Sequence, residues 1–151
     1  MMTSILKIVI VPVLLGLIFN YFFHGKAKWL DKAMPIISMA GIGFIIMIIT
    51  AAGRDDLLSI GALLILVAII HNLMGYVFGY WGCKIFGMSE QDCRTIAFEV
   101  GMQNGGLATG IALEMGKIST VGLAPAIFGP WMNISGSSLA TWWRDKQPKK
   151  K

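Results

Sequence analysis

The sequence predicts an all-α integral membrane protein with five transmembrane helices. Hydrophobic residues make up 56% of its 151 residues, and charged residues make up only 14%. The charges are unevenly spread, because long uncharged runs occupy residues 8–24, 33–53, 57–83 and 118–143. A helix needs about 20 mostly apolar residues to cross the hydrocarbon core, and residues 95–113 form a further apolar segment that only Glu99 interrupts. The five helices are expected over residues 5–23, 33–52, 57–83, 91–116 and 119–143.

The first two helices are predicted from apolar stretches that each contain a proline. Pro12 lies inside the first stretch, where a membrane helix tolerates it better than a soluble helix does. A secretory signal peptide is the alternative for this segment, but no small-residue cleavage motif precedes residues 21–24. Pro35 lies near the first turn of the second helix. We therefore expect both segments to be membrane spans of the mature protein.

The later helices carry polar residues inside otherwise apolar runs. His71 and Asn72 lie in the third helix, where a hydrogen bond between helices is favoured over a functional role. The fourth helix is expected to start near Gln91, because capping and acidic residues occupy positions 89–92. Asn133 lies in the fifth helix and is expected to face a cavity or a partner helix, since the glycosylation sequon that it spells is unreachable inside a span.

The distribution of basic residues predicts the orientation in the membrane. Alternate loops place ten of the 13 lysines and arginines on one side, and such an excess marks the cytoplasmic side. The C-terminus with its basic tail, residues 145–151, is therefore expected in the cytoplasm and the N-terminus outside, in a multi-pass protein of the cell's inner (plasma) membrane. Basic residues scattered over loops do not form the clustered patch of a nucleic-acid-binding protein. The ten residues are Lys26, Lys28, Lys32, Lys84, Arg94, Arg144, Lys146, Lys149, Lys150 and Lys151.

The fourth helix contains the least helix-like stretch of the sequence, RTIAFEVGMQNGGLATG at residues 94–110. Glu99 is the charged residue inside this apolar segment. A charged side chain near the centre of a membrane span costs about 2.5–3.5 kcal/mol and usually marks an ion or proton pathway. The alternative for Glu99 is a buried carboxyl group that forms a hydrogen bond with His71 or Asn72 of the neighbouring helix.

Glycine and asparagine residues predict that this helix is discontinuous near residues 102–105. Three glycines between positions 101 and 106 weaken a helix, and Asn104 tolerates an irregular backbone. Carbonyl groups freed by the unwinding, together with the Glu99 carboxylate and the Gln103 amide oxygen, would form an oxygen cage for a hard monovalent cation. Close helix packing is the other role open to the glycines, and the two roles are compatible.

The two cysteines, Cys83 and Cys93, flank one loop that is predicted to be cytoplasmic. Their spacing matches no metal-binding pair, and the cytoplasm is a reducing compartment. They are therefore interpreted as free thiols without a special role.

Three motifs resemble those of the bile acid:sodium symporter family. They are HNLMGYVFGYW at residues 71–81, TIAFEVGMQNGGLA at residues 95–108 and APAIFGPWMNISGSSLATWWR at residues 124–144. The resemblance implies a fold of ten membrane helices built as two inverted repeats of five, of which this chain is similar to the C-terminal repeat alone. Residues 1–56 would then supply two panel helices, and residues 57–144 would supply three core helices, including the discontinuous helix at residues 91–116.

The resemblance also implies roles for individual residues. Sodium would bind at Glu99, Val100, Met102 and Gln103. The substrate cavity would be faced by Asn104, Gly105 and Asn133, and His71 and Asn72 on the neighbouring helix are expected to support the site. The family commonly has serine at the position of Gly105 and often histidine at that of Met132. These two differences weigh against steroid binding, and members of the family also carry smaller organic acids such as pantothenate.

Together these observations predict half of a sodium-coupled symporter that carries an organic anion, bile acid-like or smaller, by alternating access. Its partners would be the lipid bilayer, the anion, and a first-repeat chain or missing N-terminal half. A transport-incompetent membrane fragment or assembly subunit is the alternative. An enzyme using Glu99 and His71 is disfavoured, because no nucleophile–base pair or metal pair accompanies them.

Overall fold

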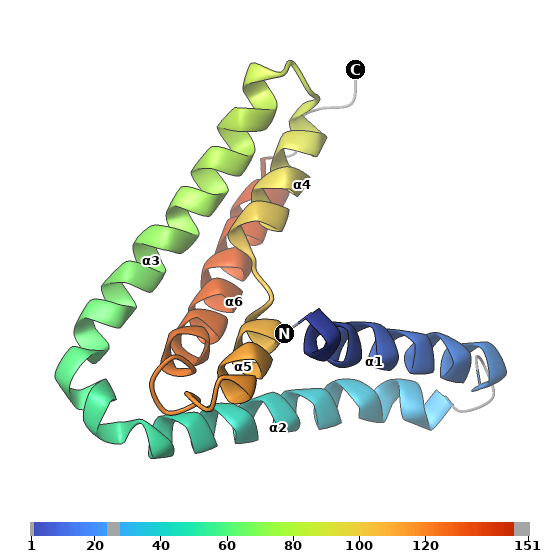
Figure 1. The fold of residues 1–151 in the computed structure, drawn as a ribbon. Coiled ribbons are helices and arrows are strands. Elements are labelled where there is room, and N and C mark those ends of the chain that lie inside the picture. The colour runs from blue at the N-terminus through green and yellow to red at the C-terminus, as the bar shows by residue number, and fades with distance from the viewer. Residues whose placement is uncertain (1, 24–27, 147–151) are drawn as a thin grey trace. The chain divides into compact units, whose positions relative to one another are not determined.

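The computed structural model describes residues 2–23 and 28–146, and these residues form helices joined by short turns, without a strand among them. Four of the ten basic residues that were counted for the orientation lie outside the described residues, namely Lys26, Lys149, Lys150 and Lys151. The all-α prediction is confirmed for the described part of the chain. The helices are α1 (Met2–Phe23), α2 (Lys28–Ala52), α3 (Arg54–Ile85), α4 (Glu90–Gly101), α5 (Gly105–Glu114) and α6 (Leu123–Arg144) (Figure 1).

Two helical segments are long and apolar enough to cross a membrane, namely Lys32–Ala52 and Arg54–Ile85. A shorter apolar segment, Val9–Phe23, lies in α1. Most large apolar side chains of α1 and α2 are exposed in the isolated chain, as expected where lipid or a partner covers them. The helices α4 and α5 have only 12 and 10 residues, so each is too short to span the hydrocarbon core alone.

The boundary between α2 and α3 differs from the sequence prediction. The helix that was expected to begin at residue 57 begins at Arg54, and residues 54–56 form the first turn of α3. Asp55 and Asp56 are favourable there, because the N-terminal end of a helix carries a partial positive charge. Only Gly53 separates the two helices.

The chain divides into two compact units, each of which combines separate stretches of sequence. Unit one comprises Met1–Leu57 and Gly106–Leu123, and unit two comprises Leu58–Gly105 and Ala124–Lys151. Unit one therefore holds α1, α2 and most of α5, while unit two holds most of α3, all of α4 and nearly all of α6. The assignment of panel and core helices to residues 1–56 and 57–144 stays a prediction.

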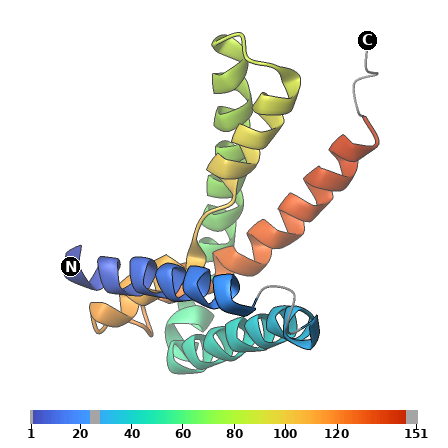
Figure 2. The ribbon, with the colours of Figure 1, turned by 90° about the vertical axis from the view of Figure 1, so that its right-hand side faces the viewer.

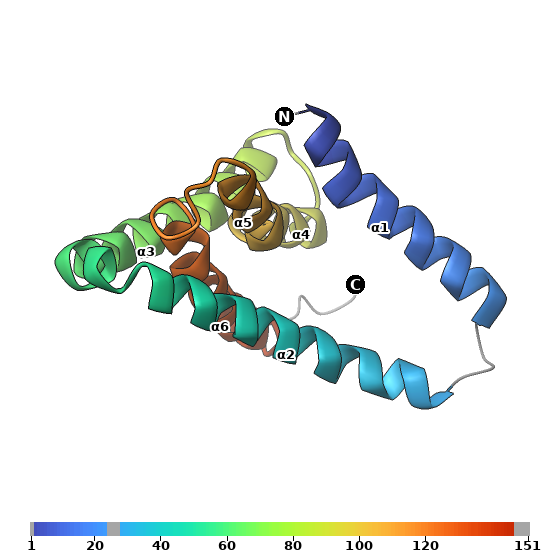
Figure 3. The same cartoon turned by 60° about the horizontal axis from the view of Figure 1, so that its bottom comes forward.

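In unit one, α1 and α2 run in roughly opposite directions (Figure 3). The end of α2 packs against the segment that precedes α6. A Cβ atom on buried Gly53 would overlap the Ser119 carbonyl oxygen and would meet the side chain of Leu123 at 2.9 Å. Ile49 and Leu123 are almost fully buried here. Glycine at position 53 thus allows the chain to turn sharply while its backbone stays in close contact with its neighbour.

In unit two, α3 and α4 lie side by side in opposite directions (Figures 1 and 2). The turn between them contains Gly87 at φ +70°, a backbone conformation that favours glycine. The Gly87 N–H donates to the Lys84 carbonyl oxygen at 3.0 Å. Ser89 then caps α4 by accepting a hydrogen bond from the Asp92 N–H at 3.2 Å, which agrees with the predicted helix start.

Small residues allow the backbones of α3 and α4 to touch. A Cβ atom on Gly75 would lie 2.9 Å from the Gly101 Cα atom, and one on Gly79 would lie 2.8 Å from the Ala97 Cα atom. Ala97 and Gly101 are both buried. We call the paired positions along this contact the glycine seam, which consists of Gly75 and Gly79 on α3 and of Ala97 and Gly101 on α4. Such small-residue contacts are typical of helix packing in membranes.

Candidate functional site

The helix that was predicted to be discontinuous is interrupted in the structure. The helix α4 ends at Gly101, and the next residue, Met102, has an extended backbone at φ −94° and ψ 110°. Its N–H still donates to the Phe98 carbonyl oxygen at 2.8 Å. The Gly105 N–H, at the start of α5, donates to the Gln103 carbonyl oxygen at 3.0 Å. The prediction of a break near residues 102–105 is therefore confirmed, with the irregular backbone at residues 102–104.

The glycines around the break have different physical roles. A Cβ atom on Gly101 would overlap the ring of Tyr76, so the packing of α3 against α4 requires glycine at this position. A Cβ atom on Gly105 would meet only the Pro125 carbonyl oxygen, at 3.7 Å, which is an ordinary contact. Gly105 therefore leaves room that a small side chain could occupy.

A buried hydrogen-bond network supports the end of α4. Asn72 is 0% exposed, and its Nδ2 donates to the carbonyl oxygen of Gly101 at 2.9 Å. The Ser135 hydroxyl donates to Asn72 Oδ1 at 2.6 Å, and the Tyr76 hydroxyl lies 3.1 Å from the same serine oxygen. Because these residues come from α3 and α6, the network holds three helices together where α4 stops. The interhelical hydrogen bond favoured from the sequence for Asn72 is confirmed.

Tyr76 and Ser135 were missed by reasoning from the sequence. Tyr76 follows Asn72 by four residues, so both side chains lie on one face of α3. Ser135 belongs to a run of small polar residues in α6 whose individual partners the sequence does not specify. The helical spacing of Tyr76 was the available signal.

His71 contacts a residue of the break. Its Nε2 atom lies 2.8 Å from Nε2 of Gln103, and the ring of Phe128 packs edge to face against it with the centroids 5.6 Å apart. With the nitrogen of the Gln103 amide as donor and neutral His71 as acceptor, the amide oxygen of Gln103 keeps its lone pairs for another group. The alternative in which His71 or Asn72 bonds Glu99 is wrong for this structure, since Asn72 bonds the carbonyl of Gly101 and His71 contacts Gln103 instead.

The side chains of Glu99 and Asn133 form no polar contact with the other predicted site residues. Both side chains are exposed, and neither forms a hydrogen bond or ion pair with any described residue. Val100 and Met102 are also exposed, next to the break. Asn104 stands immediately before α5, where asparagine is among the preferred capping residue types. The assignment of these residues as ligands of sodium or of the substrate stays a prediction.

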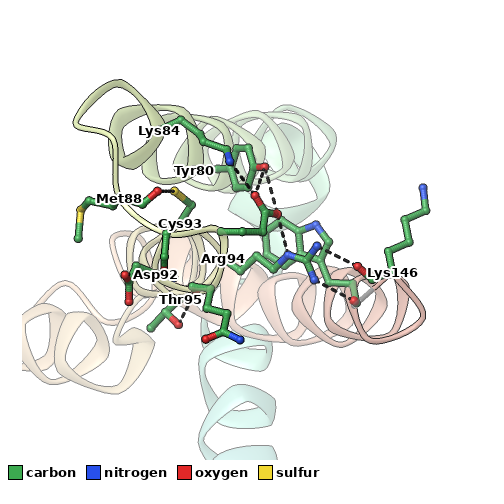
Figure 4. A network of polar contacts seen from close by, with 12 residues as sticks. Tyr80, Lys84, Met88, Asp92, Cys93, Arg94, Thr95 and Lys146 are labelled. Atoms are coloured by element: carbon green, nitrogen blue, oxygen red, sulfur yellow. Dashed lines mark hydrogen bonds and ion pairs between the residues drawn. The ribbon is translucent and has the colours of Figure 1, made fainter. Parts of the chain in front are cut away.

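A second polar cluster lies where α3 ends and α4 begins, at the opposite end of α4 from the break (Figure 4). The carboxylate of Glu90 accepts from Lys84 Nζ and from Arg94 Nε, each at 2.9 Å, and from the Tyr80 hydroxyl at 2.9 Å. The hydrogen bond from Lys84, followed by that from Arg94, lowers the pKa of Glu90 to about 2. From the sequence, Lys84 and Arg94 served only as orientation signals.

Arg94 extends this cluster to α6. Its Nη1 donates to the Trp143 carbonyl oxygen at 3.0 Å, and its Nη2 donates to the Lys146 carbonyl oxygen at 3.1 Å. The guanidinium group also lies 5.5 Å from the centroid of the Trp143 ring. Carbonyl groups at the C-terminal end of a helix lack partners within the helix, and Arg94 supplies donors to this end of α6. Both ends of α4 are thus tied to α3 and α6.

The described residues contain no cluster of three or more histidine, cysteine, aspartate or glutamate side chains.

The comparisons of the sequence with known proteins identify one family. The family model described as "Sodium Bile acid symporter family" matches residues 1–60. An uncharacterized sodium-dependent transporter of Bacillus subtilis, YocS, is 40% identical over 97% of this chain and 46% of its own length. The probable sodium/metabolite cotransporters BASS1 and BASS5 of Arabidopsis thaliana chloroplasts are 29% and 31% identical, over 99% and 97% of this chain and 37% of each of their own lengths.

The resemblance inferred from the motifs is confirmed: the chain is related to the sodium bile acid symporter family. The similarity extends beyond the residues matched by the family model, because each of these relatives aligns with nearly the whole chain. The chain spans about half the length of the Bacillus relative and less of the two plant relatives.

Proposed function

We propose that this chain forms one half of a sodium-coupled symporter for a small organic anion. The observation that carries the proposal is the interruption at residues 102–104, close in sequence to the Glu99 carboxylate, which pairs with none of the residues that the structure describes. Broken helices with freed backbone groups are a recurring ion-binding device of secondary transporters. The names of the relatives, which are sodium-dependent transporters and probable sodium/metabolite cotransporters, support the same coupling ion.

The sodium ion, as a transported partner, would bind to oxygen atoms on both sides of the break. Glu99 supplies a carboxylate, Gln103 supplies an amide oxygen, and Val100 and Met102 supply backbone carbonyls. The contact of the Gln103 amide nitrogen with His71 supports this role, because it turns the amide oxygen of Gln103 away from the histidine. His71 therefore acts as a positioning residue for Gln103.

The organic anion would contact Asn104, Gly105 and Asn133. Asn133 offers an exposed amide on α6, and Gly105 leaves space beside the Pro125 carbonyl. An amide N–H group can donate a hydrogen bond to a carboxylate or sulfonate. We propose a small organic acid, pantothenate-like in size, as the substrate, with a bile acid-like steroid as the larger alternative.

The other half of the symporter would be an inverted repeat of five helices that completes the binding site. The lengths of the relatives support this, since the chain spans only 46% of the Bacillus transporter. In this arrangement the protein would lie in the plasma membrane with the C-terminus in the cytoplasm. The competing function is an assembly subunit or membrane fragment that does not transport by itself.

The test is uptake of radiolabelled organic acids by cells that express the chain together with a first-repeat partner from a relative. We expect uptake in Na⁺ buffer and not in choline buffer, with Glu99→Ala abolishing the Na⁺ dependence. Glu114→Ala is the matched control, because Glu114 is an exposed carboxylate at the end of α5, outside the proposed site. Na⁺-dependent uptake that survives Glu99→Ala unchanged would show that the proposed ion site is wrong. Na⁺-coupled uptake by the chain alone in proteoliposomes would instead exclude the need for a second half.

A further inference from the structure

The two cysteines of the chain both lie in the interior of unit two. Cys83 lies near the end of α3 and is 4% exposed, and Cys93 lies in the first turns of α4 and is 0% exposed. Both are free thiols in this structure. The interpretation from the sequence gave them no role, because their separation along the chain matches no metal-binding motif.

The register of α3 against α4 places these cysteines opposite each other. Along α3, Gly75, Gly79 and Cys83 follow one another at intervals of four residues, so they lie on one face of the helix. Along α4, which runs in the opposite direction, Cys93, Ala97 and Gly101 do the same. Gly75 faces Gly101 and Gly79 faces Ala97 in backbone contact. One helical turn beyond the glycine seam, Cys83 on α3 and Cys93 on α4 are the next two residues that face each other in this register.

The contacts of the side chains agree with this register. Both side chains point into the protein, since Cys83 and Cys93 are both buried. The Cys93 thiol in turn donates to the Met88 carbonyl oxygen at 3.7 Å, within the turn that joins the two helices (Figure 4). A disulfide requires Cα atoms about 4.4–6.8 Å apart, with the Cβ atoms directed toward each other. The backbone contact of Gly79 with Ala97 holds α3 and α4 close together one helical turn away from the cysteine pair.

We propose that Cys83 and Cys93 form a reversible disulfide that joins α3 to α4. The oxidant is a small-molecule disulfide such as oxidised glutathione. The thiolate of one cysteine attacks a sulfur of the oxidant, which forms a mixed disulfide and releases one glutathione thiolate. The thiolate of the second cysteine then attacks the protein sulfur of the mixed disulfide and releases the second glutathione thiolate. The cysteine pair loses two electrons and two protons, and the oxidant is reduced to two thiols.

The disulfide has a defined structural effect. It closes a short loop through the turn that contains Gly87, at the end of the hairpin where Glu90 already joins α3 to α4. In the reduced protein, α4 is held there by ion pairs and packing, whereas in the oxidised protein a covalent bond fixes its register on α3.

The test uses the full chain, purified in detergent and treated with oxidised glutathione. We expect the intact mass to fall by two hydrogen atoms, peptide mapping to show a Cys83–Cys93 cross-link, and dithiothreitol to reverse both changes. Cys83→Ser and Cys93→Ser provide single-thiol controls that cannot form the cross-link. Circular dichroism spectra that match the unchanged chain establish that these variants fold.

A control pair of cysteines, separated along the sequence by nearly as many residues as the natural pair, tests the register of α3 against α4. Gly82→Cys combined with Cys83→Ser moves the thiol of α3 by one residue, to a position where an added Cβ atom meets no other atom within 4 Å. Because one residue is about a quarter turn of helix, we expect the natural pair to cross-link about tenfold faster than this control. Equal rates for the two pairs, a stable glutathione adduct without a cross-link, or chains joined only to other chains would each overturn the proposal.

Discussion

The glycine seam makes a quantitative prediction for Gly79→Ala. A Cβ atom at position 79 would lie 2.8 Å from the Ala97 Cα atom and 2.8 Å from the Ile96 carbonyl oxygen. Both are backbone atoms, so no flexible side chain can move aside, and α3 and α4 must separate. Forcing an extra methyl group into such a packed contact typically costs about 1–3 kcal/mol. Alanine also favours a helix over glycine by about 1 kcal/mol, which offsets part of this cost.

Gly82→Ala isolates the helix-propensity contribution, because an added Cβ atom there meets nothing within 4 Å. We therefore expect Gly82→Ala to leave the free energy of unfolding unchanged or to raise it slightly. The free energy of unfolding of Gly79→Ala should be lower than that of Gly82→Ala by about 1–3 kcal/mol, which is the packing cost alone. The assay is denaturant unfolding of the purified chain in detergent, followed by circular dichroism at matched detergent concentrations. Equal stabilities of the two variants would refute the close backbone contact between α3 and α4.

Two further predictions concern the polar clusters at the ends of α4. Asn72→Leu removes a donor to the Gly101 carbonyl and an acceptor for Ser135, so the free energy of unfolding should fall by roughly 1–3 kcal/mol. The control, Ser138→Ala, removes only a hydrogen bond within α6 and should change this free energy little. Equal effects of the two substitutions would contradict the network. The pKa of Glu90 is lowered from 4.5 to about 2, so its stabilising contribution is complete above pH 4.5 and is lost as the pH falls through about 2. In unfolding titrations, the difference in free energy of unfolding between the unchanged chain and Glu90→Gln should therefore become smaller between pH 4.5 and 2. A difference that does not change with pH would show that the ion pairs of Glu90 do not cause it.

The helical class and the break in the fourth helix could be predicted because both depend on local composition. Uncharged runs of membrane length predict helices, and glycines beside Asn104 predict a weak point in one of them. The hydrogen bond of Asn72 could be predicted as a type of interaction, since a buried amide inside an apolar helix needs a partner. Its actual partner, the Gly101 carbonyl, depends on where α4 stops and on how the helices cross.

The Glu90 cluster was missed for a different reason. Charged residues near the ends of spans have an evident role as orientation signals, and this role concealed the pairing of Lys84 and Arg94 with one carboxylate. The register that pairs Cys83 with Cys93 was also missed, because spacing along the sequence was compared with metal motifs and not with the packing of two helices. Only the contacts of Gly75 and Gly79 with α4 fix that register.

The way in which Arg94 binds the end of α6 affects what sequence comparison can detect. Both acceptors are main-chain carbonyl oxygens, those of Trp143 and Lys146. Every amino acid offers the same carbonyl group, so substitution at either acceptor position preserves the hydrogen bond. Relatives that keep this anchor should therefore retain arginine at position 94 while the acceptor positions vary independently, and covariation between these positions will not report the contact.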